Sequence, residues 1–197
     1  MSYPSFFDEV EVIKVVDPLS NVLGAFEMGS YEFNYLDVVK SAGHSCPTVA
    51  GAYLITKEAL KAIYGDKPAM RGDIKVEFKE DLEDGVAGVI GNVVSQITGA
   101  TDKSGFKGLA GKFARHSLMS FNAPISTSAK FTSVSNSKSV EVIYDPNSVM
   151  PSPDMQPLMQ KMMSGQAEPS EIKEFGALWQ DRVKRIFEST DKVITIK

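Results

Sequence analysis

The sequence contains little cysteine and histidine for a chain of 197 residues, with one Cys and two His. A single cysteine excludes an intrachain disulfide and every all-cysteine zinc or iron–sulfur site within the chain. Basic residues are also too few to favour nucleic acid, because 21 Lys and Arg against 25 Asp and Glu give a net charge of −4. We therefore predict no nucleic-acid partner.

Long apolar runs are missing as well. The longest apolar stretch, residues 49–55, is much shorter than the roughly 20 residues that a membrane-spanning helix needs. The start of the chain has no basic cluster followed by an apolar core, so it does not have the pattern of a signal peptide. We expect a soluble, cytoplasmic protein without a membrane partner.

The pattern of apolar residues predicts a mixture of helices and strands. Hydrophobic residues make up 43% and charged residues 23%, which is typical of a globular chain with one sizeable core. Helical spacing predicts helices over 34–41, 47–64 and 172–187. Alternation or β-branched content predicts strands over 7–16, 74–79, 86–98, 112–121, 129–135, 139–144 and 193–196. The expected fold class is α+β, an antiparallel or mixed sheet with helices packed on it.

The composition changes after Asp145-Pro146. Residues 146–169 contain five of the nine methionines, at a spacing that fits an amphipathic helix docking on the body or on a partner subunit. We predict an α+β domain over residues 1–150. A helical C-terminal extension over residues 151–197 is expected to pack on the same domain.

The segment 43–48, Gly-His-Ser-Cys-Pro-Thr, carries the main chemical signal. In an extended segment the side chains of His44 and Cys46 point the same way, so imidazole and thiol can converge. Pro47 suits the first position of a helix, which places Cys46 at the N-cap, where a thiolate is favoured. The pair predicts a metal site or a catalytic cysteine. The structural alternative is a small buried Cys46 and a hydrogen-bonded His44.

Two further groups of residues complete the predicted site. His116, in the expected strand 112–121, is the candidate third metal ligand, with a solvent-facing strand residue as the alternative. Asn92, Gln96 and Thr98 lie at even spacing in the expected strand 86–98 and are predicted to line a ligand pocket. Ordinary polar strand positions would show the same spacing.

Two motifs carry a resemblance to a known family. The run 35–48, Tyr-Leu-Asp-Val-Val-Lys-Ser-Ala-Gly-His-Ser-Cys-Pro-Thr, resembles the signature of the FmdE family, whose name comes from a component of formylmethanofuran dehydrogenase. Residues 97–101, Ile-Thr-Gly-Ala-Thr, resemble the family's Leu-Thr-Gly-Cys-Thr, and Gly111-Lys112 resembles a following Gly-Lys. The matches lie in the family's order between about residues 35 and 121.

The resemblance implies a compact α+β fold similar to the sheet-and-helix domain of glyceraldehyde-phosphate dehydrogenase, often dimeric. It also implies a transition-metal site, usually zinc, built around His44 and Cys46. This chain departs from the family pattern at Thr48, where the family has glycine, and at Ala100, where it has cysteine. His116 would then compensate, or the metal would bind weakly, or the pocket would serve a small organic ligand.

Three hypotheses follow. The first is an FmdE-like protein that binds zinc or another divalent transition metal through His44, Cys46 and His116. The second is an enzyme in which Cys46 is the nucleophile and one of the two histidines is the base. The third is a small-molecule-binding module whose metal site is degenerate. A homodimer is expected in each case.

Overall fold

The fold is organised around one buried helix, α3 (Pro47–Tyr64), in a computed structural model that describes residues 2–197. Eleven of the 18 residues of α3 are buried. The helix begins at Pro47, where the missing N–H of proline leaves no donor unpaired, and ends before Gly65, which has φ 65°. These two signals are the ones that the sequence offered, and the predicted helix over 47–64 is confirmed.

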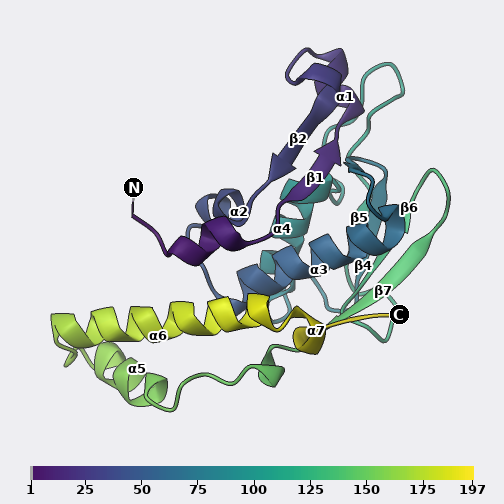
Figure 1. The fold of residues 1–197 in the computed structure, drawn as a ribbon. Helices are drawn as coiled ribbons and strands as arrows, with labels where there is room; N and C mark the ends of the chain where they lie inside the picture. Colours follow the sequence, from purple (N-terminus) through teal and green to yellow (C-terminus); the bar gives the residue numbers. More distant parts are fainter. Residues whose placement is uncertain (1) are drawn as a thin grey trace.

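A five-stranded mixed sheet packs against α3 (Figure 1). Its order is β5-β4-β6-β7-β8, with β4 and β5 parallel and the other neighbours antiparallel. The strands are β4 (Ile74–Phe78), β5 (Met119–Ser120), β6 (Ala129–Ser133), β7 (Ser139–Tyr144) and β8 (Ile194–Ile196). Alternate side chains of β6 and β7, among them Phe131 and Val142, are buried, so one face of the sheet forms the core with α3.

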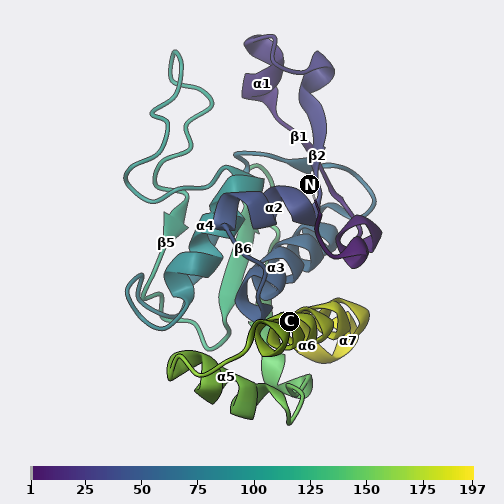
Figure 2. The ribbon, with the colours of Figure 1, turned by 90° about the vertical axis from the view of Figure 1, so that its left-hand side faces the viewer.

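Helices surround α3 on its other sides. Figure 2 shows α2 (Tyr35–Ala42) and α4 (Ala87–Thr98) on one side of α3 and α6 (Pro169–Glu188) on the other. The hairpin partner of α6 is α5 (Met155–Met163), and the short α7 (Thr190–Val193) leads into β8. Three 3-10 turns cover Ser5–Glu9, Glu27–Gly29 and Pro146–Ser148. The predicted α+β class is confirmed, with seven helices and two mixed sheets among residues 2–197.

The second sheet forms an arm that projects from the body in both views (Figures 1 and 2). It has the order β2-β1-β3, with β1 (Ile13–Val16) antiparallel to β2 (Ser30–Phe33) and parallel to β3 (Ala69–Met70). The short helix α1 (Pro18–Val22) lies at the tip, where no helix was predicted. We refer to residues 13–33 as the arm.

Asp17 ties the base of the arm to the body. Its carboxylate is buried and lies 2.6 Å from Nη2 of Arg115 and 3.0 Å from Nη1 of Arg71. Burial raises the pKa of Asp17, but the hydrogen bond from Arg71 and the charge of Arg115 outweigh it, so the pKa lies below its ordinary value. Arg71 also donates to the carbonyls of Gln96 and Ile97 in α4. The arm is therefore anchored to the end of α4.

The predicted strand over 86–98 is wrong, because this segment forms α4. Its β-branched residues suggested a strand, but the buried positions include Gly91, Val94 and Thr98, spaced three or four apart as on one helix face. A Cβ on Gly91 would lie 2.8 Å from Phe121, so glycine here allows α4 to approach its neighbour closely. Tertiary packing overrides the local strand preference.

Two other predicted strands are shorter than expected. Only Met119–Ser120 of the segment 112–121 is a strand, because Phe113 and Ser117 adopt positive φ angles that interrupt an extended chain. In the segment 7–16, residues 5–9 form a 3-10 turn and the strand is limited to Ile13–Val16. The remaining predicted strands and the C-terminal helix are confirmed, with small differences at their ends.

The contact between α3 and β7 allows a test of the central packing. A Cβ added to Gly51 would lie 2.2 Å from the ring of Tyr144, whose hydroxyl donates to the carbonyl of Pro47 at 2.6 Å. We expect Gly51→Ala to lower the free energy of unfolding by about 1–3 kcal/mol, because the ring must move in a filled core. Urea denaturation followed by circular dichroism measures the change.

Gly176 provides the matched control, since it also lies within a helix but has nothing within 4 Å of the added Cβ. Gly176→Ala should raise stability by about 0.5–1 kcal/mol through helix propensity alone. Equal effects of the two substitutions would contradict the close packing of Tyr144 on α3.

Candidate functional site

The segment 43–48 joins α2 to α3 through a sharp turn. Gly43, with φ 77°, ends α2 in the left-handed conformation that favours glycine. Cys46 occupies the N-cap of α3, as predicted, and its Sγ accepts a hydrogen bond from the backbone N–H of Val49 at 3.4 Å. The sulfur therefore satisfies one of the free donors at the start of the helix.

Cys46 is part of the hydrophobic core. The residue is 9% exposed, and Ser45 beside it is also buried. Helix α6 covers this turn, because Nε1 of Trp179 and Nε2 of Gln180 both donate to the carbonyl of Ser45, at 3.0 and 3.2 Å. The sulfur lies behind the C-terminal helix and has little contact with solvent.

A tyrosine closes the other side of the turn. The hydroxyls of Tyr35 and Ser45 lie 2.9 Å apart, and Tyr35 is fully buried. Burial raises the pKa of Tyr35 well above its ordinary value, so the phenol stays neutral. Tyr35 therefore stabilises the turn through Ser45, and its neutral phenol cannot act as a base toward the thiol of Cys46.

His44 has the opposite environment, because its side chain is exposed. Its Nδ1 lies 3.0 Å from the carbonyl oxygen of Ala42, which can only accept, so Nδ1 carries a hydrogen. In the neutral imidazole Nε2 is then a free acceptor, and it has no hydrogen-bond partner within residues 2–197. Of the predicted pair, Cys46 is therefore buried in the core and His44 lies at the surface.

His44 lines a pocket of about 450 Å³ between the end of α2 and the face of α4. Asn92 and Gln96 line the same pocket, because residues four apart lie on one face of a helix. Gln96 also donates through Nε2 to the carbonyl of Asp37 at 3.3 Å, which links the two walls. The full lining is Ser41, Ala42, His44, Val89, Asn92, Val93, Ser95 and Gln96.

Thr98, predicted with Asn92 and Gln96, does not line this pocket. Its side chain is buried, donates to the carbonyl of Val94 at 2.7 Å and accepts from the N–H of Ala100 at 3.1 Å. It therefore closes the last turn of α4. On a strand, the three residues would share one face because their spacing is even. On a helix, only Asn92 and Gln96, which are four residues apart, share a face.

The metal ligands expected from the sequence are not brought together. His116 lies in a turn of the loop before β5, where its Nδ1 contacts the hydroxyl of Ser117 at 3.0 Å. Within residues 2–197, no three His, Cys, Asp or Glu side chains are placed to hold a metal ion. Ala100 is buried and supplies no ligand atom. The donor set of this chain does not fit the three-ligand site.

The sequence missed the contribution of α6 and the non-polar wall of the pocket. The helical spacing over 172–187 gave no indication that the indole N–H of Trp179 would reach the carbonyl of Ser45. Val89 and Val93 supply apolar surface in the same pocket as Asn92 and Gln96, which a strand assignment could not show.

The comparison with protein families gives one match. A family model described as "FmdE, Molybdenum formylmethanofuran dehydrogenase operon" matches residues 42–196. No curated protein matches the chain. The matched range contains the 43–48 turn and extends across residue 150 to β8, so the division of the chain at that residue stays a prediction. Within residues 2–197, no helix combines the length and the apolar character needed to cross a membrane.

The burial of Cys46 predicts an unreactive thiol. We expect iodoacetamide to alkylate the native protein at least about tenfold more slowly than the urea-unfolded chain, because burial limits access of the reagent to the sulfur. Mass spectrometry over a time course measures both rates. Equal rates would restore the hypothesis of a nucleophilic Cys46.

Proposed function

This chain belongs to the FmdE family, and from that premise we propose that it binds a small, polar organic molecule in the pocket beside His44. The observation that supports the proposal is the joint lining of one pocket by His44, Asn92 and Gln96. Its volume of about 450 Å³ falls within the usual range for ligand sites.

The lining has the chemistry of a polar recognition site without formal charge when His44 is neutral. His44 offers the Nε2 acceptor, and the carboxamides of Asn92 and Gln96 offer donors and acceptors. The hydroxyls of Ser41 and Ser95 add two rotatable groups. A neutral molecule with several hydrogen-bonding groups and a small apolar face matches this surface better than a strong acid.

A divalent transition metal such as zinc is the alternative occupant, and one observation favours it. An imidazole whose Nδ1–H is held by a backbone carbonyl, as in His44, has the orientation common among metal-binding histidines. One imidazole with neutral amides and hydroxyls is nevertheless a poor donor set for zinc. This donor set therefore favours a small organic ligand over a divalent metal in the pocket beside His44.

The proposal predicts a specific loss on substitution of His44. A compound that raises the melting temperature of the wild-type protein in a metabolite panel should bind His44→Ala or Asn92→Ala about fivefold more weakly, the effect of one lost hydrogen bond. Isothermal titration calorimetry measures the dissociation constants.

His116→Ala is the matched control, because His116 lies outside the pocket and should leave the affinity unchanged. Elemental analysis of untagged protein separates the two occupants: stoichiometric zinc that disappears in His44→Ala would overturn the organic-ligand proposal in favour of the metal. A ligand whose affinity responds to neither His44 nor Asn92 would remove the pocket from consideration.

We further propose that the chain forms a homodimer through the tip of the arm. Leu23 is 63% exposed and Met28 77% exposed, and Val22 and Phe26 are exposed beside them. Four large apolar side chains on one projecting segment form a patch typical of an interaction site.

The arm-tip patch predicts a change of association state. Sedimentation velocity should show a dimer for the wild-type protein and a monomer for the double variant Leu23→Asp and Phe26→Asp, because a charge buried in an apolar contact is strongly unfavourable. Val134→Asp, at an exposed position outside the arm, is the control. A dimer that persists in the double variant would mean that the interface lies elsewhere.

A further inference from the structure

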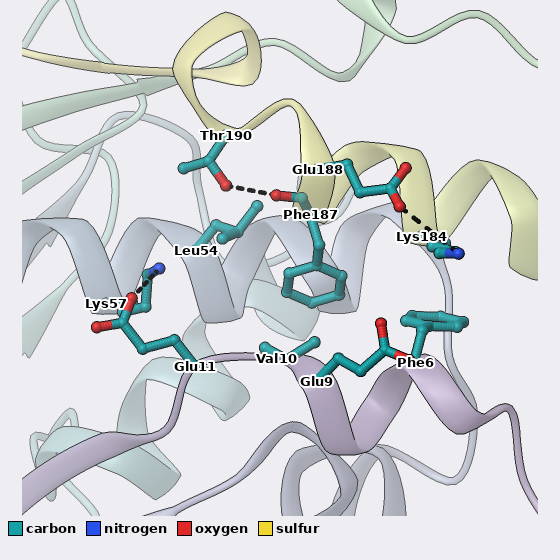
Figure 3. Close-up of a pocket in the computed structure, with 10 residues that line it drawn as sticks. All are labelled: Phe6, Glu9, Val10, Glu11, Leu54, Lys57, Lys184, Phe187, Glu188 and Thr190. Carbon is teal, nitrogen blue, oxygen red and sulfur yellow. Dashed lines mark hydrogen bonds and ion pairs between the residues drawn. The ribbon is translucent and has the colours of Figure 1, made fainter.

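A second cavity lies where the N-terminal segment, α3 and α6 come together (Figure 3). Its volume is about 230 Å³, enough for a benzene-sized body with a short chain. Phe6 and Val10 from the N-terminal segment, Leu54 from α3 and Phe187 from α6 form apolar walls. Phe6 and Val10 precede the residues that the family model matches, whereas Leu54 and Phe187 lie within them.

The rim carries both signs of charge, but its lysines are already paired. Nζ of Lys57 lies 2.9 Å from Glu11 and 3.1 Å from Glu58. Burial lowers the pKa of Lys57, but the hydrogen bonds to Glu11 and Glu58 outweigh it and keep the ammonium charged. Lys184 lies 3.6 Å from Glu188 on the next turn of α6. Both lysines therefore already have a carboxylate partner.

Glu9 is the rim residue without a counter-charge. Its side chain is exposed, and no cation within residues 2–197 forms an ion pair with it. In Figure 3 its carboxylate lies on the same side of the cavity as the ring of Phe6. The uncompensated charge of the rim is therefore negative, next to an aromatic surface.

The two aromatic rings strengthen the preference for a cation. The ring centroids of Phe6 and Phe187 are 6.4 Å apart, and the rings are inclined at 49°. Aromatic faces attract ammonium groups through their quadrupole, and apolar walls exclude water from the remainder of the ligand. We propose that this cavity binds a small primary amine, with its aryl or short alkyl body among Phe6, Leu54 and Phe187 and its ammonium at Glu9.

Phenethylamine is the probe for this site, with 2-phenylethanol and phenylacetate as neutral and anionic counterparts of similar shape. Titrations followed by amide chemical shifts at low salt should place the amine near Leu54 and Phe187. The amine should bind at least about fivefold more tightly than the alcohol, and phenylacetate should bind most weakly, because one partly exposed charge pair and one cation–π contact contribute modestly.

Glu9→Gln should weaken phenethylamine about threefold to fivefold and leave 2-phenylethanol unchanged, since only the charge is removed. Glu83→Gln, another exposed glutamate outside the cavity, should change neither. His44→Ala should also leave the amine affinity unchanged, so this site stands or falls separately from the proposed function. Equal binding of the amine and phenylacetate, no effect of Glu9→Gln, or the absence of shifts at Leu54 and Phe187 would each overturn the proposal.

Discussion

The burial of α3 along its length is the constraint on which the rest of the structure depends. The first N–H groups of a helix need partners from outside it, and Val49, which carries one of them, is fully buried. In this chain one of these partners is the sulfur of Cys46. The same residue that the motif offers for chemistry is therefore used to start the central helix, and its position at the N-cap brings it into the core instead of exposing it.

The inner and outer faces of the 43–48 turn therefore have different environments. On the inner face, Ser45 and Cys46 are held by Tyr35, by the N-terminus of α3 and by Trp179 of α6. On the outer face, His44 is oriented by the carbonyl of Ala42 and lines a polar pocket. The turn is therefore a structural element on its inner face, and its outer face carries the side chain for which we propose a binding role.

Sequence reasoning located the parts of the fold that have local stop and start signals. The helix at 47–64 carries Pro47 and Gly65, and the hairpin over 129–144 alternates cleanly, so both could be predicted. The segment 86–98 could not, because its Val and Ile content favours a strand locally and only packing against α3 and Phe121 selects the helix. Asn92 and Gln96 were predicted to share a pocket on an assumed strand face, and a helix placed them together for a different reason. The separation of His44 from Cys46 depends on the burial of the neighbouring α3, which no two-residue spacing encodes.

The pocket and the arm are also connected through one arginine. Arg71 bonds the buried Asp17 at the base of the arm, and it donates to the carbonyls of Gln96 and Ile97 at the end of α4. Gln96 lines the pocket beside His44. The base of the arm is therefore bonded, through Arg71, to a residue that lines this pocket. Because the carboxylate of Asp17 and the guanidinium of Arg115 are both buried, the junction is held by charge-assisted bonds that are expensive to break. The pocket wall on α4 and the base of the arm are thus held by the same side chain, that of Arg71.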